Sequence, residues 1–458
     1  MLTDKIRHTI ARYHMIPPGG RVLAAVSGGP DSVAMLHALA EFAPEYGYTL
    51  AVAHLDHGFR PESAEEAAFV GDMARGMGLV FVTERSDIKQ RLELSPENKQ
   101  AAAREARYSF LARAAQETGS DAIAVGHTAD DQAETYIMRE LRGSGMHGLS
   151  AIPPVRGNII RPLIEATRAD VMEYLSQKGL QYRTDPSNLR PDYLRNRIRL
   201  ELMPRLLEYN PKLVEALCNS AEIHRDEDEF LDAYTSDMLN TIVAEKSACL
   251  VALDIAKLED LPVAILRRAI RQVVAQVKGD LLSVGFGHIM EAVELATMGG
   301  TGRGVDMPGG VRVERSYDRL LVYGPDAAPK EFSVTLPVPG RVEVPEAGVS
   351  VEVSLTKGGP GPVTGKGAAL VDMDKITGPL TVRSRRPGDT FQPVGMEGSK
   401  KLKELFIDLK LPRFERARTP IVECGGEIVW VAGIRADRRF AADEATKDAL
   451  LIKCEKLA

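Results

Sequence analysis

Paired cysteines are missing from this sequence. Its cysteines never form a Cys-x-x-Cys motif, and no histidine lies at zinc-finger spacing from any of them; they are Cys218, Cys249, Cys424 and Cys454. Zinc ribbons and iron–sulfur loops need thiolates close together in the chain. The pattern therefore disfavours such sites and indicates four reduced, mostly buried thiols.

Long apolar runs are also absent. No apolar stretch approaches the ~18 residues that a membrane-spanning helix needs, and residues 1–18 are charged and amphipathic, without the apolar core of a signal peptide. With 44% hydrophobic and 27% charged residues, the composition is ordinary for a globular protein. It excludes a disordered, collagen-like or disulfide-scaffold chain. We expect a cytoplasmic protein with no membrane partner.

An excess of positive charge is the third absence. The sequence has 58 Lys and Arg residues against 64 Asp and Glu residues, a net charge of −6, which alone does not favour nucleic acid as a partner. The charge is unevenly spread, since residues 222–229 are strongly acidic whereas residues 383–418 hold ten basic and five acidic residues. Residues 185–205 hold five arginines and three acids. Both basic segments could contact phosphates or could simply be solvated faces.

The first part of the chain alternates two kinds of pattern. Short apolar β-like runs occupy residues 21–27, 49–55, 79–83 and 121–126, and helical spacing occupies residues 32–42, 64–77, 99–118 and 130–142. Strands separated by helices of this length predict an α/β fold with a doubly wound parallel sheet. Such sheets bind ligands beyond the carboxyl ends of their strands.

The remaining chain changes character twice. At roughly 100–200 residues per domain, 458 residues predict about three domains. We expect a catalytic domain over residues 1–210 and a mainly helical middle domain over residues 211–325, with a hairpin at 311–323. Residues 326–458 should form a β-rich connector and a small α+β C-terminal domain. The helical middle could carry a homodimer interface or could position a partner.

The first chemical signal is a glycine-rich loop between a strand and a helix. It reads Ser27-Gly28-Gly29-Pro30-Asp31-Ser32. Glycines let backbone N–H groups approach a phosphate, and the following helix adds its positive end. The loop has neither the Lys-Ser/Thr of the common NTPase loop nor the Gly-x-Gly-x-x-Gly of a dinucleotide site. A capped helix start after a glycine turn is the structural alternative.

A second signal is an acidic helix start after the fourth strand. His127 precedes Asp130, Asp131 and Glu134, and residues 130 and 134 share a helix face. Their oxygens could bind Mg²⁺ beside a bound phosphate, bind a substrate ammonium, or only complement the helix dipole. Asp56, at the end of the second strand, could be a ligand or a turn cap.

Further candidates leave similar alternatives. Arg104 and Arg107 could clamp phosphate or pair with nearby acids, and His54 and His57 could be structural. Arg195, Arg197 and Arg199 form a tight cluster that could contact ATP or RNA phosphates.

Longer motifs carry a resemblance to a known family. The loop sequence SGGPDS is similar to the pyrophosphate loop of N-type ATP pyrophosphatases, the PP-loop family. Together with the segment HLDHGFR, the helix AAAREARY and the segment GHTADDQAET, it resembles the tRNA(Ile)-lysidine synthetase family. The C-terminal segments RRPGD, KKLKELFIDLKLP and GIRADRRF resemble the last domain of that family. The resemblance is strong over about the first 200 residues, whereas the middle is similar only in being helical.

This resemblance implies a reaction with three substrates. ATP would bind with Mg²⁺, and the O2 atom of the wobble cytidine (position 34) in tRNA(Ile) with anticodon CAU would attack its α-phosphate. The ε-amine of free L-lysine would then attack C2 and release AMP. The modified base would read AUA rather than AUG, changing the identity of the tRNA from Met to Ile.

The candidate residues divide into four groups. The catalytic candidates are Asp31, Asp130, Glu134, Arg104 and His127, with Asp130 favoured for the lysine ammonium. The ATP-binding candidates are Ser27, Gly28, Gly29, Pro30, Asp31, Ser32 and Asp56. The Mg²⁺ candidates are Asp31 and Asp131. The tRNA-binding candidates are Arg195, Arg197, Lys400, Lys401 and Lys403.

Three other functions fit parts of the sequence less well. A thiolating tRNA enzyme needs cysteines near the site, and no cysteine precedes Cys218. An amidotransferase-type synthetase needs a glutaminase, and position 2 is leucine. A non-catalytic RNA-binding protein would need neither the intact loop nor the acids.

Overall fold

The computed structural model describes residues 1–56, 63–86, 99–183, 193–247, 249–327, 330–358, 364–365 and 367–457. His57 and residues 185–192 of the first basic segment lie outside these residues. The chain divides into two compact units, Met1–Phe230 and Leu231–Ala458. The domain boundaries after residues 210 and 325 stay predictions. Among the described residues, no helix combines the length and apolar character needed to cross a membrane.

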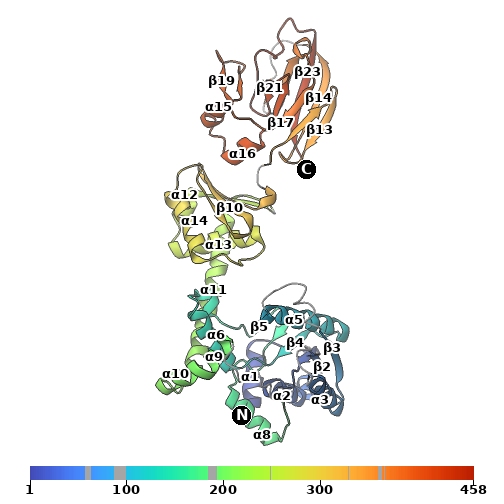
Figure 1. Ribbon diagram of the computed structural model, residues 1–458, viewed down its shortest axis with the longest axis vertical. Helices are drawn as coiled ribbons and strands as arrows, with labels where there is room; N and C mark the ends of the chain where they lie inside the picture. The colour runs from blue at the N-terminus through green and yellow to red at the C-terminus, as the bar shows by residue number, and fades with distance from the viewer. Residues whose placement is uncertain are drawn as a thin grey trace. The chain divides into compact units, whose positions relative to one another are not determined.

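The first unit is built on a six-stranded sheet in the order β3-β2-β1-β4-β6-β5 (Figure 1). All neighbouring strands are parallel except the edge strand β5, which is antiparallel to β6. The strands are β1 Arg21–Ala25, β2 Thr49–Asp56, β3 Val80–Arg85, β4 Ala122–Val125, β5 Val155–Arg156 and β6 Ile159–Ile160. The predicted parallel sheet is confirmed.

Alternate residues of the central strand face opposite layers of helices. Val22 and Ala24 join the apolar core formed with α1, α2, α3 and α8, whereas Leu23 and Ala25 join the core formed with α5. Side chains alternate along a strand, so a run of apolar residues is needed where both faces are covered. The helices are α1 Leu2–Arg12, α2 Pro30–Tyr46, α3 Ser63–Gly76, α5 Lys99–Thr118, α6 Ala129–Glu140, α7 Met146–Leu149 and α8 Arg168–Lys178.

A chain of helices follows the sheet. It comprises α9 Leu194–Arg197, the π-helical turn Ile198–Leu202, α10 Met203–Tyr209 and α11 Leu213–Ile242, which contains the boundary between the units. Ile198 and Met203 are buried against Ala133 of α6. This packing fixes the π-helical turn beside the acidic helix α6, which matters for the site.

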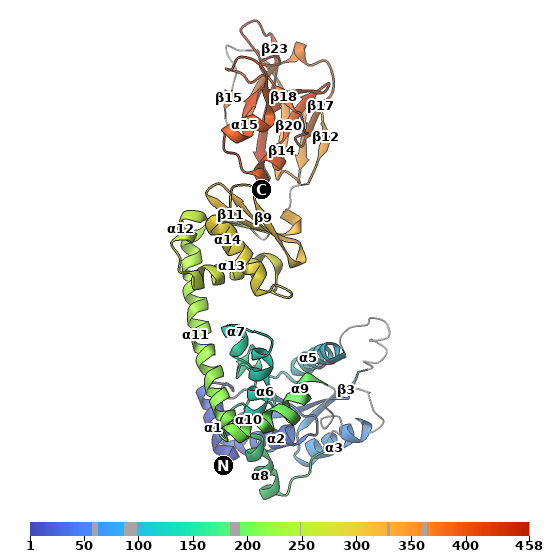
Figure 2. The same cartoon turned by 60° about the vertical axis from the view of Figure 1, so that its left-hand side comes forward.

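The second unit begins with helices over a five-stranded antiparallel sheet in the order β7-β8-β11-β10-β9 (Figure 2). Its helices are α12 Ile255–Glu259, α13 Val263–Lys278 and α14 Phe286–Met298. Its strands are β7 Val243–Lys246, β8 Leu250–Asp254, β9 Gly304–Met307, β10 Val311–Ser316 and β11 Arg319–Tyr323. The predicted helices and the β10–β11 hairpin are present, and the structure adds β7, β8 and β9.

The last part of the chain contains two five-stranded sheets and a small two-stranded one. Both large sheets contribute to one core, in which Val351 of β14 and Val382 of β17 are fully buried. The first has β12 Ser333–Leu336, β17 Leu380–Arg383, β20 Ile421–Cys424, β21 Glu427–Val431 and β22 Arg435–Ala436. The second has β13 Gly340–Val344, β14 Val349–Lys357, β15 Thr364–Gly365, β16 Ala368–Asp372 and β23 Asp448–Lys456.

Two short helices complete the predicted α+β architecture. The pair β18 Thr390–Phe391 and β19 Lys400–Lys401 leads into α15 Leu402–Asp408, and α16 Arg413–Arg418 follows. Phe406 of α15 is fully buried in a separate apolar cluster with Ile421 and Val431.

Candidate active site

The sheet topology places the two strongest sequence motifs side by side. β1 pairs with both β2 and β4 in parallel, so the order of strands along the chain reverses at β1. A crevice opens at such a switch point, beyond the carboxyl ends of the strands. The glycine-rich loop follows β1, and the acidic segment that starts at Gly126 follows β4. Both motifs therefore meet at one edge of the sheet.

The glycine-rich loop is shaped to leave donors facing outward. Gly28 has a φ of 86°, which is the left-handed region that favours glycine. The helix α2 begins at Pro30 with Gly29 as its N-cap, and no side chain caps its first N–H groups. The hydroxyl of Ser32 donates to the carbonyl of Gly29 at 3.0 Å and lies 3.2 Å from the hydroxyl of Ser27. Uncapped N–H groups at the start of a long helix suit an anion.

A second glycine allows the β4 segment to approach this loop. A Cβ atom on Gly126 would lie 3.2 Å from the backbone nitrogen of Ser32 and the carbonyl carbon of Asp31. Those are backbone atoms at the first turn of α2, so a side chain would push the loop away. This close approach brings the acidic start of α6 next to Asp31.

Four side chains form a dense ion-pair network at the acidic segment. Arg199 donates to Glu134 Oε1 at 2.6 Å and to Asp131 Oδ1 at 2.9 Å. Arg195 donates to the same Asp131 oxygen at 2.9 Å and to Glu134 Oε2 at 3.3 Å. The second Asp131 oxygen accepts the backbone N–H of Thr128 at 2.9 Å in a capping box. Both carboxylates are buried, so these bonds are what makes their charge tolerable.

The network shifts the proton equilibria of its members. Burial opposes the charged form of Asp131, but Arg195, the Thr128 N–H and Arg199 together lower its pKa. Burial likewise opposes the charge of Arg199, yet the hydrogen bond to Glu134 and the nearby carboxylates raise its pKa. Both residues therefore stay ionised at neutral pH.

Asp31 is the carboxylate without such compensation. Its buried Oδ1 atom has no hydrogen-bond partner in the described structure. Burial, followed by the negative charge of Asp131, raises its pKa to about 6, although Arg168 and Arg199 oppose the shift. A carboxylate held at a raised pKa beside an anion-binding loop is a candidate for contact with a cation or for proton transfer.

Asp130 and Asp56 are placed differently. Asp130 accepts the backbone N–H of Arg168, at the start of α8, at 2.6 Å. Asp56 is buried at the end of β2, where Arg85 approaches its carboxylate at 3.8 Å. His54 is buried on the same strand with its Nδ1 atom 2.8 Å from the carbonyl of Val26. We read His54 as a structural link between β2 and the end of β1.

His127 lies near both the carboxylate of Asp131 and several arginines. Burial, together with Arg161, Arg107 and Arg195, lowers its pKa to about 3 despite the opposing charge of Asp131. Its imidazole is therefore neutral, and its buried Nδ1 atom has no partner in the described structure. A neutral imidazole can donate or accept a hydrogen bond but adds no charge of its own.

The remaining candidate residues lie on the surface. Arg104 is exposed and sits over the ring of Tyr108 at 4.9 Å. Arg197 is exposed, 3.9 Å from Glu201. In the second unit, Lys401 and Lys403 are exposed, whereas Lys400 pairs with Asp408. The structure thus separates Arg197 from its neighbours Arg195 and Arg199, which point at the acids.

Two residues of the site were not among the main candidates. Arg199 was noted only as part of a cluster, although its spacing of four from Arg195 places both on one helix face. Arg161 is 2% exposed and lies outside the motifs that the sequence singles out. The sequence does indicate this residue, because an arginine inside the apolar run of residues 159–164 is unusual and suggests a specific role.

The carboxylates at the carboxyl ends of β1 and β4 fit Mg²⁺ in part. Asp31 offers an unpartnered oxygen, and Asp130 lies close enough to raise the pKa of Asp31. Asp131 fits less well, since its two oxygens already accept bonds from Arg195, Arg199 and Thr128. Carboxylates with free oxygens are what this ion prefers.

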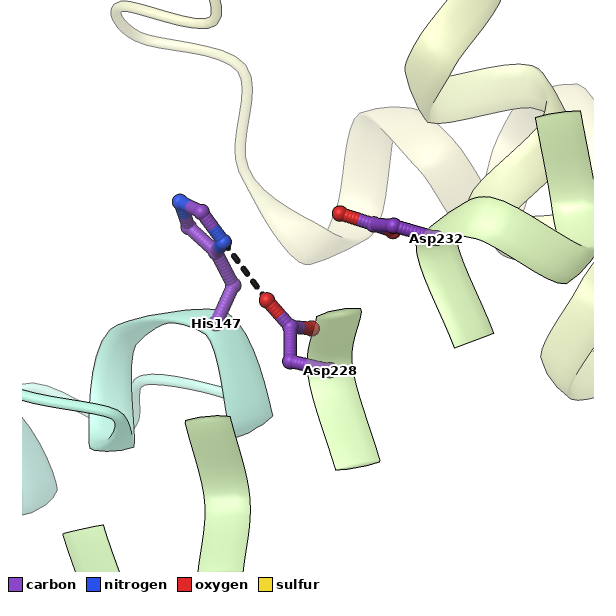
Figure 3. A group of neighbouring side chains, drawn as sticks. All are labelled: His147, Asp228 and Asp232. Atoms are coloured by element: carbon purple, nitrogen blue, oxygen red, sulfur yellow. Dashed lines mark hydrogen bonds and ion pairs between the residues drawn. The ribbon is translucent and has the colours of Figure 1, made fainter. Parts of the chain in front are cut away.

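A separate histidine–carboxylate pair lies on α7 and α11. His147 Nδ1 is 2.8 Å from Asp228 Oδ2 (Figure 3). Figure 3 also draws Asp232, whose carboxylate pairs with Arg268 at 2.5 Å within the second unit. Each acid therefore has a partner within its own unit, and we assign no metal to this group.

Comparisons with known proteins match two segments of the chain to family models and most of its length to named relatives. Residues 2–206 match the family model described as a PP-loop domain, and residues 380–452 match the TilS substrate C-terminal domain. The chain is similar to the tRNA(Ile)-lysidine synthase of Symbiobacterium thermophilum, with 38% identity covering 98% of this chain and 97% of the relative. The enzyme of that name from Solibacter usitatus is 39% identical, covering 93% and 96%.

One solved structure concerns the end of the chain. A crystal structure of a TILS C-terminal domain is 35% identical, covering 28% of this chain and 99% of that one, with a TM-score of 0.26. The match to a PP-loop domain implies the use of ATP. With near full-length relatives above 30% identity, the chain belongs to the tRNA(Ile)-lysidine synthase family, which are PP-loop ATP-dependent ligases.

Proposed function

We propose that this chain joins the ε-amine of L-lysine to C2 of the wobble cytidine of tRNA(Ile) with anticodon CAU. In the first half-reaction, cytidine O2 attacks the α-phosphate of ATP and pyrophosphate leaves. In the second, the lysine amine attacks C2, the C2–O2 bond breaks, and AMP departs with that oxygen. The ammonium of lysine loses two protons in all, one before attack and one after it.

The glycine-rich loop supports the first half-reaction. The uncapped N–H groups of α2, the left-handed Gly28 and the two serine hydroxyls suit the charge of a departing pyrophosphate. Asp31 and Asp130 would hold Mg²⁺, which supplies further neutralisation of phosphate charge when bound. The neutral His127 could donate a hydrogen bond from its unpartnered nitrogen to the reacting groups.

The unpartnered oxygen of Asp31 is the observation that best supports the second half-reaction. The sequence favoured Asp130 for the lysine ammonium, but Asp130 already accepts the N–H of Arg168, whereas Oδ1 of Asp31 has no partner. Moving a proton from an ammonium of pKa ~10.4 to a carboxylate of pKa about 6 costs about 6 kcal/mol. A carboxylate of pKa 3.8 would cost about 9 kcal/mol. The raised pKa of Asp31 thus suits it to take this proton in the second half-reaction, provided that its Oδ1 atom no longer holds the Mg²⁺ that it would bind in the first.

The arginine network has a supporting part in this proposal. Arg195 and Arg199 hold Asp131 and Glu134 in fixed positions. The negative charge of Asp131 contributes to the raised pKa of Asp31. We therefore assign Arg195 to the carboxylates rather than to tRNA. Arg197, Lys401 and Lys403, which are exposed, keep the tRNA-binding assignment, as does Lys400 beside them.

Incorporation of labelled lysine tests the function. We expect the full-length protein with ATP, Mg²⁺ and lysine to label a tRNA(Ile) transcript with anticodon CAU, at the wobble cytidine. A transcript in which uridine replaces that cytidine is the matched control and should stay unlabelled, since it lacks the reacting base. Failure to label the first transcript, with ATP bound normally, would contradict the proposal.

A further inference from the structure

Tyr108 lies at the centre of a group of arginines on the first unit. Arg104, one helical turn earlier on α5, lies 4.9 Å from the ring centre, and Arg156 of β5 lies 5.6 Å from it. The buried Arg161 forms a hydrogen bond with Tyr108 and donates to the carbonyl of Pro153 at 2.6 Å. Guanidinium groups thus approach one tyrosine from three positions in the chain.

Two more arginines extend this group at the end of α6. Arg139 donates to the carbonyls of Gly148 and Ala151 at 2.6 and 2.8 Å, and the exposed Arg142 follows. We call the set the Tyr108 cluster, and its members are Arg104, Tyr108, Arg139, Arg142, Arg156 and Arg161.

The arginines of the Tyr108 cluster have no ion-pair partner in the part of the chain that the structure describes. None of its five arginines forms an ion pair with a described carboxylate, in contrast to Arg195 and Arg199. Burial, then the charges of Arg104 and Arg142, lowers the pKa of Arg139. Burial also lowers the pKa of Arg161, with Arg156 and Arg104 adding to the effect. Such repulsion raises the free energy of the unliganded protein, and an anion would relieve it.

Unpartnered buried atoms connect the cluster to the candidate active site. The Nε atom of Arg161 is buried without a hydrogen-bond partner in the described structure, although the residue is 2% exposed. The charge of Arg161 affects the pKa of His127, as do the charges of Asp131 and Arg195. The buried Nδ1 atom of His127 has no hydrogen-bond partner in the described structure. The Nε–H group of Arg161 can therefore donate a hydrogen bond to a further acceptor.

We propose that the Tyr108 cluster binds the backbone phosphates of the tRNA anticodon loop next to the wobble cytidine. This inference rests on the proposed function. ATP already has its own phosphate loop at residues 27–32, and a single nucleotide is smaller than a surface that spans α5, α6 and β5. Arginine forks suit phosphate oxygens, and an aromatic ring can stack on an unpaired base of a loop. Holding both neighbours of the cytidine would present its base unstacked to the crevice.

A charge-matched pair of double variants tests the cluster. Arg142→Gln/Arg156→Gln removes two exposed, unpaired arginines, neither of which belongs to the catalytic set. The control, Arg75→Gln/Arg113→Gln, removes two exposed arginines of the same unit that pair with Asp72 and Glu84. Binding of tRNA(Ile) is measured by fluorescence anisotropy over a range of salt, and binding of a non-hydrolysable ATP analogue is measured separately.

The expected outcome is specific to tRNA and to salt. The cluster variant should bind tRNA about tenfold more weakly, and the slope of log K against log salt should fall by about 1.5, as for two lost phosphate contacts. Affinity for the ATP analogue and thermal unfolding should match the control. Arg142→Lys/Arg156→Lys should recover most of the salt slope, because it keeps the charge.

Three outcomes would overturn the proposal. Equal tRNA affinity and salt slope in the cluster and control variants would remove the cluster from the tRNA interface. A loss confined to the ATP analogue would assign it to the nucleotide instead. If Arg142→Lys/Arg156→Lys did not recover the salt slope and also lowered the unfolding temperature, the role of the Tyr108 cluster would be structural. Failure of the proposed function can be distinguished from failure of this inference. If the function were wrong, the unmodified protein would not incorporate lysine, whatever the tRNA affinities of the variants.

Discussion

Replacing Asp31 with asparagine is expected to stabilise the free protein while abolishing adenylation. The folded-state pKa of about 6 lies above the ordinary 3.8, so the fold binds the proton more tightly than the unfolded chain does. Ionised Asp31 therefore destabilises the fold, increasingly as pH rises from about 4 to 6 and fully above 6. The shift corresponds to about 3 kcal/mol, which screening and the α2 dipole reduce to roughly 1–2 kcal/mol.

Urea unfolding at pH 4.5 and pH 8 checks this expectation. The gain of Asp31→Asn over the unmodified protein should be small at pH 4.5 and largest at pH 8. Asp170→Asn is a control of opposite sign, because hydrogen bonds from Lys5 and Thr167 outweigh burial and lower the pKa of Asp170. That variant should lose stability at pH 8. If Asp31→Asn were also less stable at pH 8, Asp31 would be a structural acid at the start of α2.

The largest loss of stability is expected for Arg199→Met. Glu134 is 3% exposed and would keep only Arg195, whose nearest nitrogen is 3.3 Å away. Removing one partner of a buried ion pair leaves a charge without compensation and costs about 3–5 kcal/mol. We expect a loss near the lower end, because Arg195 remains. The activity should fall with it, since Asp131 and Glu134 would no longer be held against Asp31.

The single tryptophan allows the two units to be followed separately. Trp430 lies in the second unit and is 1% exposed, so its fluorescence reports on that unit alone. In Arg199→Met the fluorescence transition should be unchanged, while hydrogen exchange in the first unit accelerates. The double variant Glu134→Leu/Arg199→Met should recover stability but not activity, because an apolar pair can replace a buried ion pair. Equal loss in both units would contradict the local explanation.

Local patterns predicted much of the fold. The apolar runs ending at Ser27 and Gly126 are buried on both faces, so they appear in the sequence as continuous hydrophobic segments. By contrast, β7 and β9 are short edge strands with exposed residues, and nothing in their local spacing separates them from loops. Their place in the sheet depends on pairing with β8 and β10.

The site was predictable as a set of residues but not as a set of contacts. The segment of residues 126–135 identifies Asp130, Asp131 and Glu134, yet sequence alone does not say which carboxylate is already engaged. That depends on Arg195 and Arg199, more than 60 positions away, and on a backbone N–H of Arg168. Only tertiary structure shows Asp31 as the unpartnered acid.

The central claim is that the site at the carboxyl ends of β1 and β4 first adenylates the wobble cytidine and then transfers lysine to it. A single-turnover experiment with ATP labelled in its α-phosphate tests it most directly. Without lysine, the label should appear on tRNA(Ile) as pyrophosphate is released, and added lysine should then discharge it as AMP. Asp31→Asn should leave the tRNA unlabelled. If the label never enters the tRNA although lysine is incorporated, the proposed order of chemistry at this site is contradicted.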